Sequence, residues 1–341
     1  MRCKIIVMAV LCVALAFSAR AQAQKIVITT PGAALHFFPA HVAAAAGLFA
    51  SEGLEVEWVD VGAGSKQVAS VAGGSATMTM LGMQPAITAA EHGADLVAFA
   101  ALFNKYPIQV VLHPQVMQRI GLTRNMPIDE KVKRLAGLTI GITGVTSSSD
   151  SVLRSLLLAR GLDPDKALRI QPLGAPNAML AALSKKAIDG AMLSAPQAQI
   201  AEAGGYGMTA IDPLTGEVPE LNGVPYTAMI TTRDTLKRQP DVILKATKAI
   251  AKAMALEDKD PERVQQLLQS KIFPEIDPKL FASFEPAYRP AAAPNPIITP
   301  EDYARLLKWM NILDPKPITV RYEPMIDTEF AKRAAAEILG R

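Results

Sequence analysis

The chain has 341 residues, half of them hydrophobic, which is too long for one typical core and predicts two domains. Its formal net charge is +3, but Arg2, Lys4 and Arg20 supply that excess, and the remaining 32 basic residues balance the 32 acidic ones. A neutral surface gives no reason to expect nucleic acid or an anionic membrane as a partner.

The first 23 residues have the pattern of a cleavable export signal. Two basic residues precede an unbroken apolar run, Ile5–Phe17, which is followed by overlapping small-x-small sites in 18–23. The run is roughly a dozen residues long, whereas a membrane-spanning helix needs about 20, which argues against an anchor. We expect cleavage after Ala23, or after Ala21 as second choice, and a mature protein in the periplasm.

Short β-rich runs alternate with helical stretches in the first part of the chain. We expect strands at 25–29, 54–59, 76–81, 96–102 and 108–112, and helices at 39–46, 65–72 and 84–91. This alternation predicts parallel βαβ units in a sheet that is covered on both faces.

A second unit of the same kind follows a pause at His113-Pro114. We expect strands at 138–143, 167–171, 188–193 and 208–211, and helices at 149–160, 177–185 and 197–203. The Pro/Gly-rich stretch 212–225 is typical of a linker. A strand at 226–231 follows, and the remainder is mostly helical, at 240–256, 261–270, 278–288 and 300–312.

Two α/β units and a helical tail predict an α/β fold of two lobes. We assign 24–113 and 225–341 to the first lobe and 114–224 to the second, because the tail most simply packs back on the first unit. The two crossings between lobes then form a hinge, and a hinge between two sheets creates a cleft. Since open α/β sheets bind ligands beyond the carboxyl ends of their strands, the strand-to-helix loops should face that cleft.

Three stretches between 25 and 211 carry a specific order of motifs. They are Pro39-x3-Ala43-x3-Gly47-Leu48-Phe49-x3-Gly53-Leu54; Leu135-Ala136-Gly137-Leu138-Thr139-Ile140-Gly141-Ile142 with Thr146-Ser147-Ser148-Ser149 and Gly161-Leu162-Asp163-Pro164; and Ala181-Ala182-Leu183-x4-Ile188-Asp189-Gly190-Ala191. In these motifs the chain resembles the ABC-transporter solute-binding proteins for aliphatic sulfonates, taurine, nitrate and thiamine pyrimidine precursors. Ala76 and Met83 depart from the pattern, because relatives often carry polar or acidic residues there.

The resemblance implies a two-lobed periplasmic-binding-protein fold of type II and reversible capture of a small molecule. It also implies a membrane permease with its ATPase as the partner. We expect a monomer with no cofactor.

A hydroxyl-rich turn is the strongest local feature. Thr146, Ser147, Ser148 and Ser149 follow a predicted strand and open a helix, where free N–H groups and the positive end of the helix dipole suit a sulfonate or carboxylate. The alternative is plain N-capping, which serine and aspartate commonly provide. Four hydroxyls in a row exceed that need.

The remaining candidate ligand residues follow other strands at the expected cleft, except Tyr226, which lies at the second crossing between lobes. They are His36, Phe37, Phe38, Met83, Gln84, Asn104, Ser194 and Tyr226. His36 can donate a hydrogen bond and a phenylalanine can cover an apolar ligand; the alternatives are a solvated loop for His36 and the core for a phenylalanine.

Enzyme signatures are missing from the sequence. Both cysteines, Cys3 and Cys12, lie in the predicted signal, and there is no Gly-x-Ser-x-Gly elbow or P-loop. His36 and His41 are five residues apart, which is a poor spacing for a zinc pair on one helix face.

The sequence therefore predicts a periplasmic solute-binding protein, not an enzyme, whose ligand is a small organic anion, a sulfonate or carboxylate with an aromatic or aliphatic body. Two alternatives stay open: a ligand-sensing subunit of a membrane receptor, and a pyrimidine-precursor enzyme of the same fold.

Overall fold

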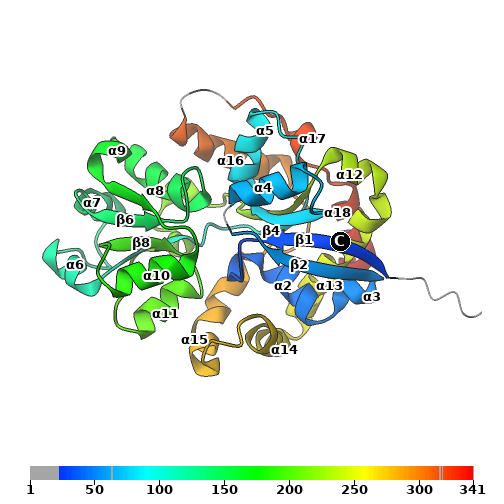
Figure 1. Cartoon of the computed structure of the whole chain (residues 1–341), viewed down its shortest axis with the longest axis horizontal. Coiled ribbons are helices and arrows are strands. Elements are labelled where there is room, and N and C mark those ends of the chain that lie inside the picture. The colour runs from blue at the N-terminus through cyan, green and yellow to red at the C-terminus, as the bar shows by residue number, and fades with distance from the viewer. Residues whose placement is uncertain (1–22, 63, 315, 317, 341) are drawn as a thin grey trace, which may run out of the picture.

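The computed structural model describes residues 23–62, 64–314, 316 and 318–340 and forms two α/β lobes (Figure 1). Each lobe is built on a five-stranded sheet. The strand order of the first sheet is β2 (Leu54–Asp60), β1 (Gln24–Thr30), β3 (Met78–Gly82), β10 (Thr227–Thr231) and β4 (Val97–Phe103). That of the second is β7 (Arg169–Pro172), β6 (Thr139–Ile142), β8 (Gly190–Leu193), β5 (Gln109–Leu112) and β9 (Met208–Ile211). The predicted two-lobed α/β class is confirmed, whereas the predicted signal lies, apart from Ala23, outside the described residues.

Both sheets are mixed, which differs from the parallel sheets expected. β1 runs parallel to β2 and β3, and β6 parallel to β7 and β8. β10 is antiparallel to β3 and β4, and β5 is antiparallel to β8 and β9. β5 and β10 each enter their lobe directly from the other lobe, so they start at the edge where the parallel strands end.

The first crossing between lobes lies at 104–108 rather than after 113. Gln109 pairs with Leu193, and Val110 pairs with Ile211, so β5 belongs to the second sheet. The predicted first-lobe segment 24–113 is therefore too long. A short, fully apolar strand fits the core of either sheet, so its sequence pattern does not say which one it joins.

Helices cover the sheets. In the first part of the chain these are α2 (Phe38–Ala45), α3 (Leu48–Ser51), α4 (Gly64–Ala72) and α5 (Met83–Glu91). The second lobe adds α6 (Pro114–Arg119), α7 (Ile128–Arg134), α8 (Ser148–Leu158), α9 (Pro164–Ala167), α10 (Pro176–Ser184) and α11 (Gln197–Ala203). The tail adds α12 (Arg233–Arg238), α13 (Pro240–Lys259), α14 (Pro261–Leu267), α15 (Pro278–Tyr288), α16 (Pro300–Leu313), α17 (Tyr322–Met325) and α18 (Glu329–Ala334).

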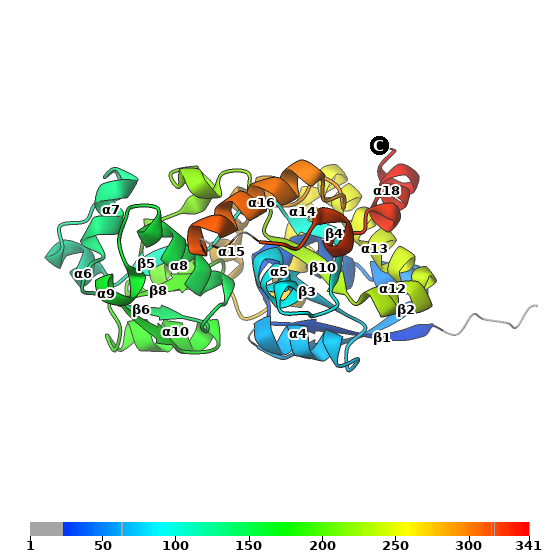
Figure 2. The ribbon, with the colours of Figure 1, turned by 90° about the horizontal axis from the view of Figure 1, so that it is seen from above.

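The helical tail contacts both lobes. α13 packs on α2, α3 and β4, and α18 packs on α13 and β4, as expected for a tail that returns to the first lobe. α16 also reaches α8, and α15 reaches α11, so these two helices extend to the second lobe (Figure 2). Among the described residues, none of the helices has the length and apolar character needed to cross a membrane.

Aromatic side chains pack together where the chain crosses between the lobes. Tyr106 of the first crossing lies 4.6 Å, centroid to centroid, from Tyr226 at the end of the second crossing, and 4.7 Å from Trp309 of α16. All three rings are buried. Tilted contacts at this distance stabilise an aromatic cluster, which ties both crossings to the tail beside the cleft.

Candidate functional site

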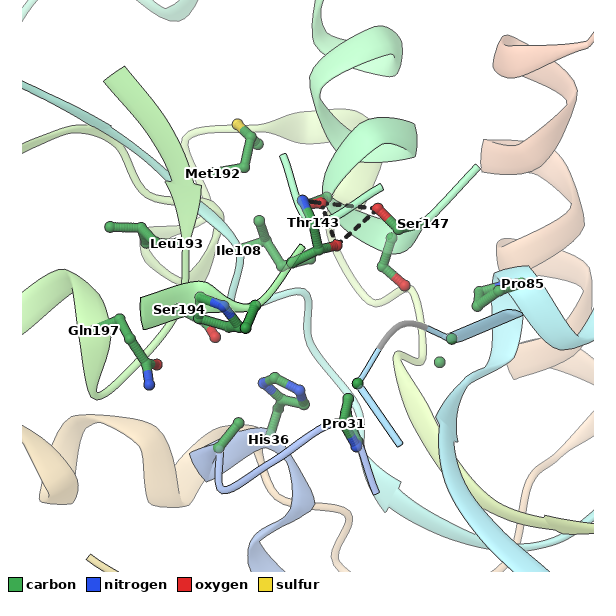
Figure 3. A pocket seen from close by; sticks show the side chains of 18 of the residues that line it. Pro31, His36, Pro85, Ile108, Thr143, Ser147, Met192, Leu193, Ser194 and Gln197 are labelled. Atoms are coloured by element: carbon green, nitrogen blue, oxygen red, sulfur yellow. Dashed lines mark hydrogen bonds between the residues drawn. The ribbon is translucent and has the colours of Figure 1, made fainter. Parts of the chain in front are cut away.

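A cavity of about 130 Å³ lies between the lobes (Figure 3). On the first-lobe side its wall follows the ends of β1, β2 and β3, with Pro31, Gly62 and Gly82 among the lining residues. On the second-lobe side it follows β6 and β8, with Thr143 and Ser194. The strand-to-helix loops therefore face the cleft as expected. Among the residues that the structure describes, no Asp, Glu, Lys or Arg lines the cavity.

The hydroxyl turn both caps α8 and lines the cavity. The Ser147 Oγ accepts a hydrogen bond from the Asp150 N–H at 3.4 Å and donates one to the Gly144 carbonyl at 2.6 Å. The Ser149 Oγ accepts from the Thr143 N–H at 3.0 Å. The capping interpretation therefore holds for Ser147. Ser148, by contrast, forms a hydrogen bond with Tyr226 of the first lobe.

His36 lines the cavity and has an unused ring nitrogen. It sits in the 3-10 turn Leu35–Phe37 and is only 9% exposed, and its ring points into the cavity (Figure 3). Within the described residues its Nδ1 has no hydrogen-bond partner. Burial, reinforced by nearby His41, lowers the pKa of His36 to about 3. The ring is therefore neutral at physiological pH and can exchange a hydrogen bond with a ligand.

Four helices begin at the cavity wall. Gly64 opens α4, while Gly82, Ser147 and Ala175 are the N-caps of α5, α8 and α10. The caps of α5 and α10 make no side-chain capping hydrogen bond. Each helix start carries roughly half a positive charge. Not every first-turn donor is free, because the Met83 N–H of α5 donates to the Tyr226 carbonyl and Pro176, which opens α10, has no N–H. The helix dipoles thus make the cavity electropositive although no cationic side chain of the described residues lines it, an arrangement that suits an anion or another strong hydrogen-bond acceptor.

The cavity brings together only part of the predicted ligand set. His36, Phe37, Ser147, Ser148, Ser149, Ser194 and Tyr226 line it. The others do not: Phe38, Met83, Gln84, Asn104 and Thr146 lie outside the wall.

The excluded residues have other surroundings. Phe38 and Met83 are buried in the core, and Thr146 is exposed, with its N–H bonded to the Asp150 carboxylate. The Asn104 N–H donates to the Ala291 carbonyl, so it serves the packing of the tail. These residues do lie in or beside loops at the ends of strands, as predicted, but the sequence pattern does not show which side of a loop or helix start faces the cleft.

Gln84 contacts the opposite lobe instead of the cavity. The Ser151 Oγ of α8 donates to the Gln84 Oε1 at 3.0 Å, and both residues are buried. The Leu35 N–H also donates to the Ala195 carbonyl across the cleft at 3.3 Å. With the Ser148–Tyr226 bond, these contacts show the lobes closed on each other around the cavity.

Several lining residues were missed by the sequence reasoning. They are polar Gln67, Thr143 and Gln197, apolar Pro31, Leu81, Pro85, Ile108, Met179, Met192 and Leu193, and the loop residues Ala33, Ala34, Gly62, Gly64, Gly82, Gly174, Ala175 and Pro176. The loop 174–176 follows a predicted strand and opens a predicted helix, so the rule applied to the hydroxyl turn would have found it. Gln67 and Met179 lie inside helices, where the sequence gives no such signal.

Comparison with known proteins agrees with this architecture. The chain is 24% identical over 310 residues to the candidate binding protein YtlA of Bacillus subtilis (strain 168), covering 89% of this chain and 87% of the relative. A solved Bordetella bronchiseptica RB50 structure matches with a TM-score of 0.78 at 21% identity, covering 93% of this chain and 98% of the other. The periplasmic aliphatic sulphonate binding protein SsuA of Escherichia coli matches with a TM-score of 0.65 at 20% identity, covering 87% and 90%.

The fold also occurs in an enzyme. The desulfurization enzyme DSZB matches with a TM-score of 0.59 at 12% identity, covering 92% of this chain and 99% of the enzyme. Fold alone therefore does not separate binding from catalysis. A family model described as NMT1-like matches residues 32–270, which include the second sheet, all strands of the first sheet except β1, and every cavity-lining residue except Pro31. The chain belongs to the NMT1-like family.

Proposed function

We propose that this protein is the periplasmic solute-binding component of an ABC importer and captures a small organic anion between its lobes. The observation that carries the proposal is the closed interlobe cavity, where four helix starts meet the ring of buried His36 and where none of the described charged side chains lines the wall. The sulphonate-binding SsuA, which shares the fold, supports this ligand class.

The size of the cavity and the residues of its wall limit which ligands can fit. Its volume of about 130 Å³ is close to the roughly 150 Å³ of a cavity that holds one benzene ring. Phe37, Leu81, Ile108 and Met192 line it beside the polar groups. We infer a monocarboxylate or monosulfonate with a compact aromatic or aliphatic body, its acid group at the helix starts and its body against the apolar side chains.

Capture without bond chemistry follows from the same groups. The pKa of His36 at about 3 makes it a weak base at neutral pH, and none of the described serine hydroxyls hydrogen-bonds to its ring. A ligand that contacts both lobes stabilises the closed form over an open one, and the closed form would dock on a permease. A receptor-linked sensing subunit would use the same cavity, so the permease is the part of the proposal that needs a partner experiment.

A thermal-shift screen of acid and amide pairs tests the ligand class. Benzoate, cyclohexanecarboxylate and benzenesulfonate should raise the melting temperature of protein lacking residues 1–23, whereas benzamide, cyclohexanecarboxamide and benzenesulfonamide should not. Ser148→Ala should reduce the shift, and Ser270→Ala, an exposed serine on the tail, should leave it unchanged. Stabilisation by the amides or by amines, with none by the acids, would contradict the proposed ligand class.

A further inference from the structure

A second hollow, which we call the α15 groove, lies between the second lobe and α15. Two adjoining hollows of about 430 and 490 Å³ share Gln109, Gln199, Glu202, Asp212 and Thr215. One extends to a group of charged side chains and the other to α15. The groove shares no lining residue with the interlobe cavity.

The charges in the α15 groove do not cancel. The Arg124 guanidinium lies 2.6 Å from the Glu202 carboxylate, and the Lys131 ammonium lies 2.6 Å from the Glu217 carboxylate. Asp212 is the third acid, and among the described residues no basic side chain lies within ion-pair distance of it. Burial raises the pKa of Asp212, and its acidic neighbours add to the rise. One carboxylate in the groove therefore lacks a counter-charge.

Two buried amide oxygens in the same groove lack partners. Gln109 is 3% exposed, and its side-chain NH2 donates to the Asp212 carboxylate, which leaves its Oε1 without a partner within the described residues. The Gln199 Nε2 donates to the Tyr288 hydroxyl at 3.4 Å, and the Gln199 Oε1 also has no partner within the described residues. The Asp212 carboxylate accepts from the Gln109 amide and fixes its orientation, so the unused Gln109 atom is an acceptor.

An acceptor-rich hollow with one unbalanced carboxylate calls for a ligand that brings hydrogen-bond donors and positive charge. We propose that the α15 groove binds a small organic cation, an amine or a guanidine. Phe284 and Tyr288 line its α15 side, and aromatic faces attract such cations. The described residues contain no cluster of three side chains fit to hold a metal ion, which favours an organic cation over a metal.

The test uses methylguanidinium and its neutral isostere methylurea, with ionic strength held constant by NaCl. In ¹⁵N-resolved NMR titrations of the protein lacking residues 1–23, methylguanidinium should shift the side-chain amide signals of Gln109 and Gln199, and methylurea should not. Asp212→Asn should weaken methylguanidinium binding at least tenfold. Glu130→Gln removes one charge from an exposed acid of α7 outside the groove and should leave binding unchanged.

Three results would overturn the proposal. Equal shifts from methylurea would show that charge is not recognised, and shifts confined to residues of the interlobe cavity would place the site elsewhere. Equal affinity of the Asp212→Asn and Glu130→Gln variants for methylguanidinium would show that the cation responds to the overall charge of the protein and not to Asp212. The wild-type titration does not depend on how well the Asp212 variant folds, and neither arm uses the anion proposed for the interlobe cavity.

Discussion

Gly82 and Ser148 meet across the cleft, and the space between them permits a sharp test of the closed form. A Cβ at Gly82 would lie 2.7 Å from the Ser148 Oγ, closer than side chains approach. The backbone of Gly82 (φ −62°, ψ 137°) is ordinary for alanine, so Gly82→Ala adds no backbone strain. The new Cβ would also lie 3.3 Å from the Pro85 Cδ, a contact within the first lobe that both the open and the closed form would share. The substitution should therefore penalise the closed state more than the open one, because only the closed state brings the Ser148 hydroxyl to this Cβ.

The size of the penalty follows from what Ser148 must give up. To make room, its hydroxyl has to leave its rotamer and lose its hydrogen bond with Tyr226, which together cost about 1–3 kcal/mol. That corresponds to roughly a 5- to 150-fold loss of ligand affinity. In the open form the two residues separate, so the melting temperature without ligand should change little.

Calorimetric titration of the best ligand from the screen into wild type, the two single variants and the double variant gives a double-mutant cycle. Gly82→Ala should weaken binding, whereas adding it to Ser148→Ala should cost nothing more, because the clashing hydroxyl is gone. Wild-type affinity in Gly82→Ala, or additive losses in the double variant, would show that the ligand is not held by lobes closed in this way.

Three further predictions concern the closed form and pH. Ser151→Ala removes the interlobe hydrogen bond to Gln84 and should weaken ligand binding by about 0.5–1.5 kcal/mol in the same titration; unchanged affinity would mean that the bond is absent when ligand is bound. Because the pKa of His36 is lowered to about 3, ligand affinity should stay constant between pH 6 and 8; a steep rise below pH 6.5 would instead indicate a cationic ring. Burial raises the pKa of Glu257 from 4.5 to about 7, and Arg289 opposes the rise. The protonated carboxyl therefore stabilises the folded state below pH 4.5, and this stabilisation is lost as the pH rises to 7. After allowance for solvent screening, Glu257→Gln should be more stable than wild type at pH 8 by about 1–2 kcal/mol in urea unfolding and should match it near pH 4; equal stability at both pH values would refute the shift.

The sequence predicted the elements of the fold well because the chain marks their ends chemically. α11 and β9 have the predicted bounds, and α16 begins at the predicted Pro300, preceded by Thr299, which forms a capping box with Asp302. Lobe membership was harder to predict. β5 and β10 have the same apolar pattern as their parallel neighbours, and their direction is set by the path of the chain between lobes rather than by their residues.

The candidate site was predictable as loops but not as side chains. The rule that ligands lie beyond the carboxyl ends of strands correctly selected the neighbourhoods of His36, Ser148 and Ser194. It could not show that Phe37 lines the cavity while Phe38 enters the core, since adjacent residues in a tight turn point in different directions. The unpaired state of the His36 Nδ1 depends on contacts from both lobes and has no signature in sequence.

The most direct test of the central claim is a crystal structure of the protein with the best organic anion from the screen. The account predicts that the ligand fills the interlobe cavity, with its acid group at the starts of α8 and α10 and a hydrogen bond from the ligand to the His36 ring. A ligand bound outside this cavity, or one held there with its acid group turned toward the apolar side chains, would contradict it.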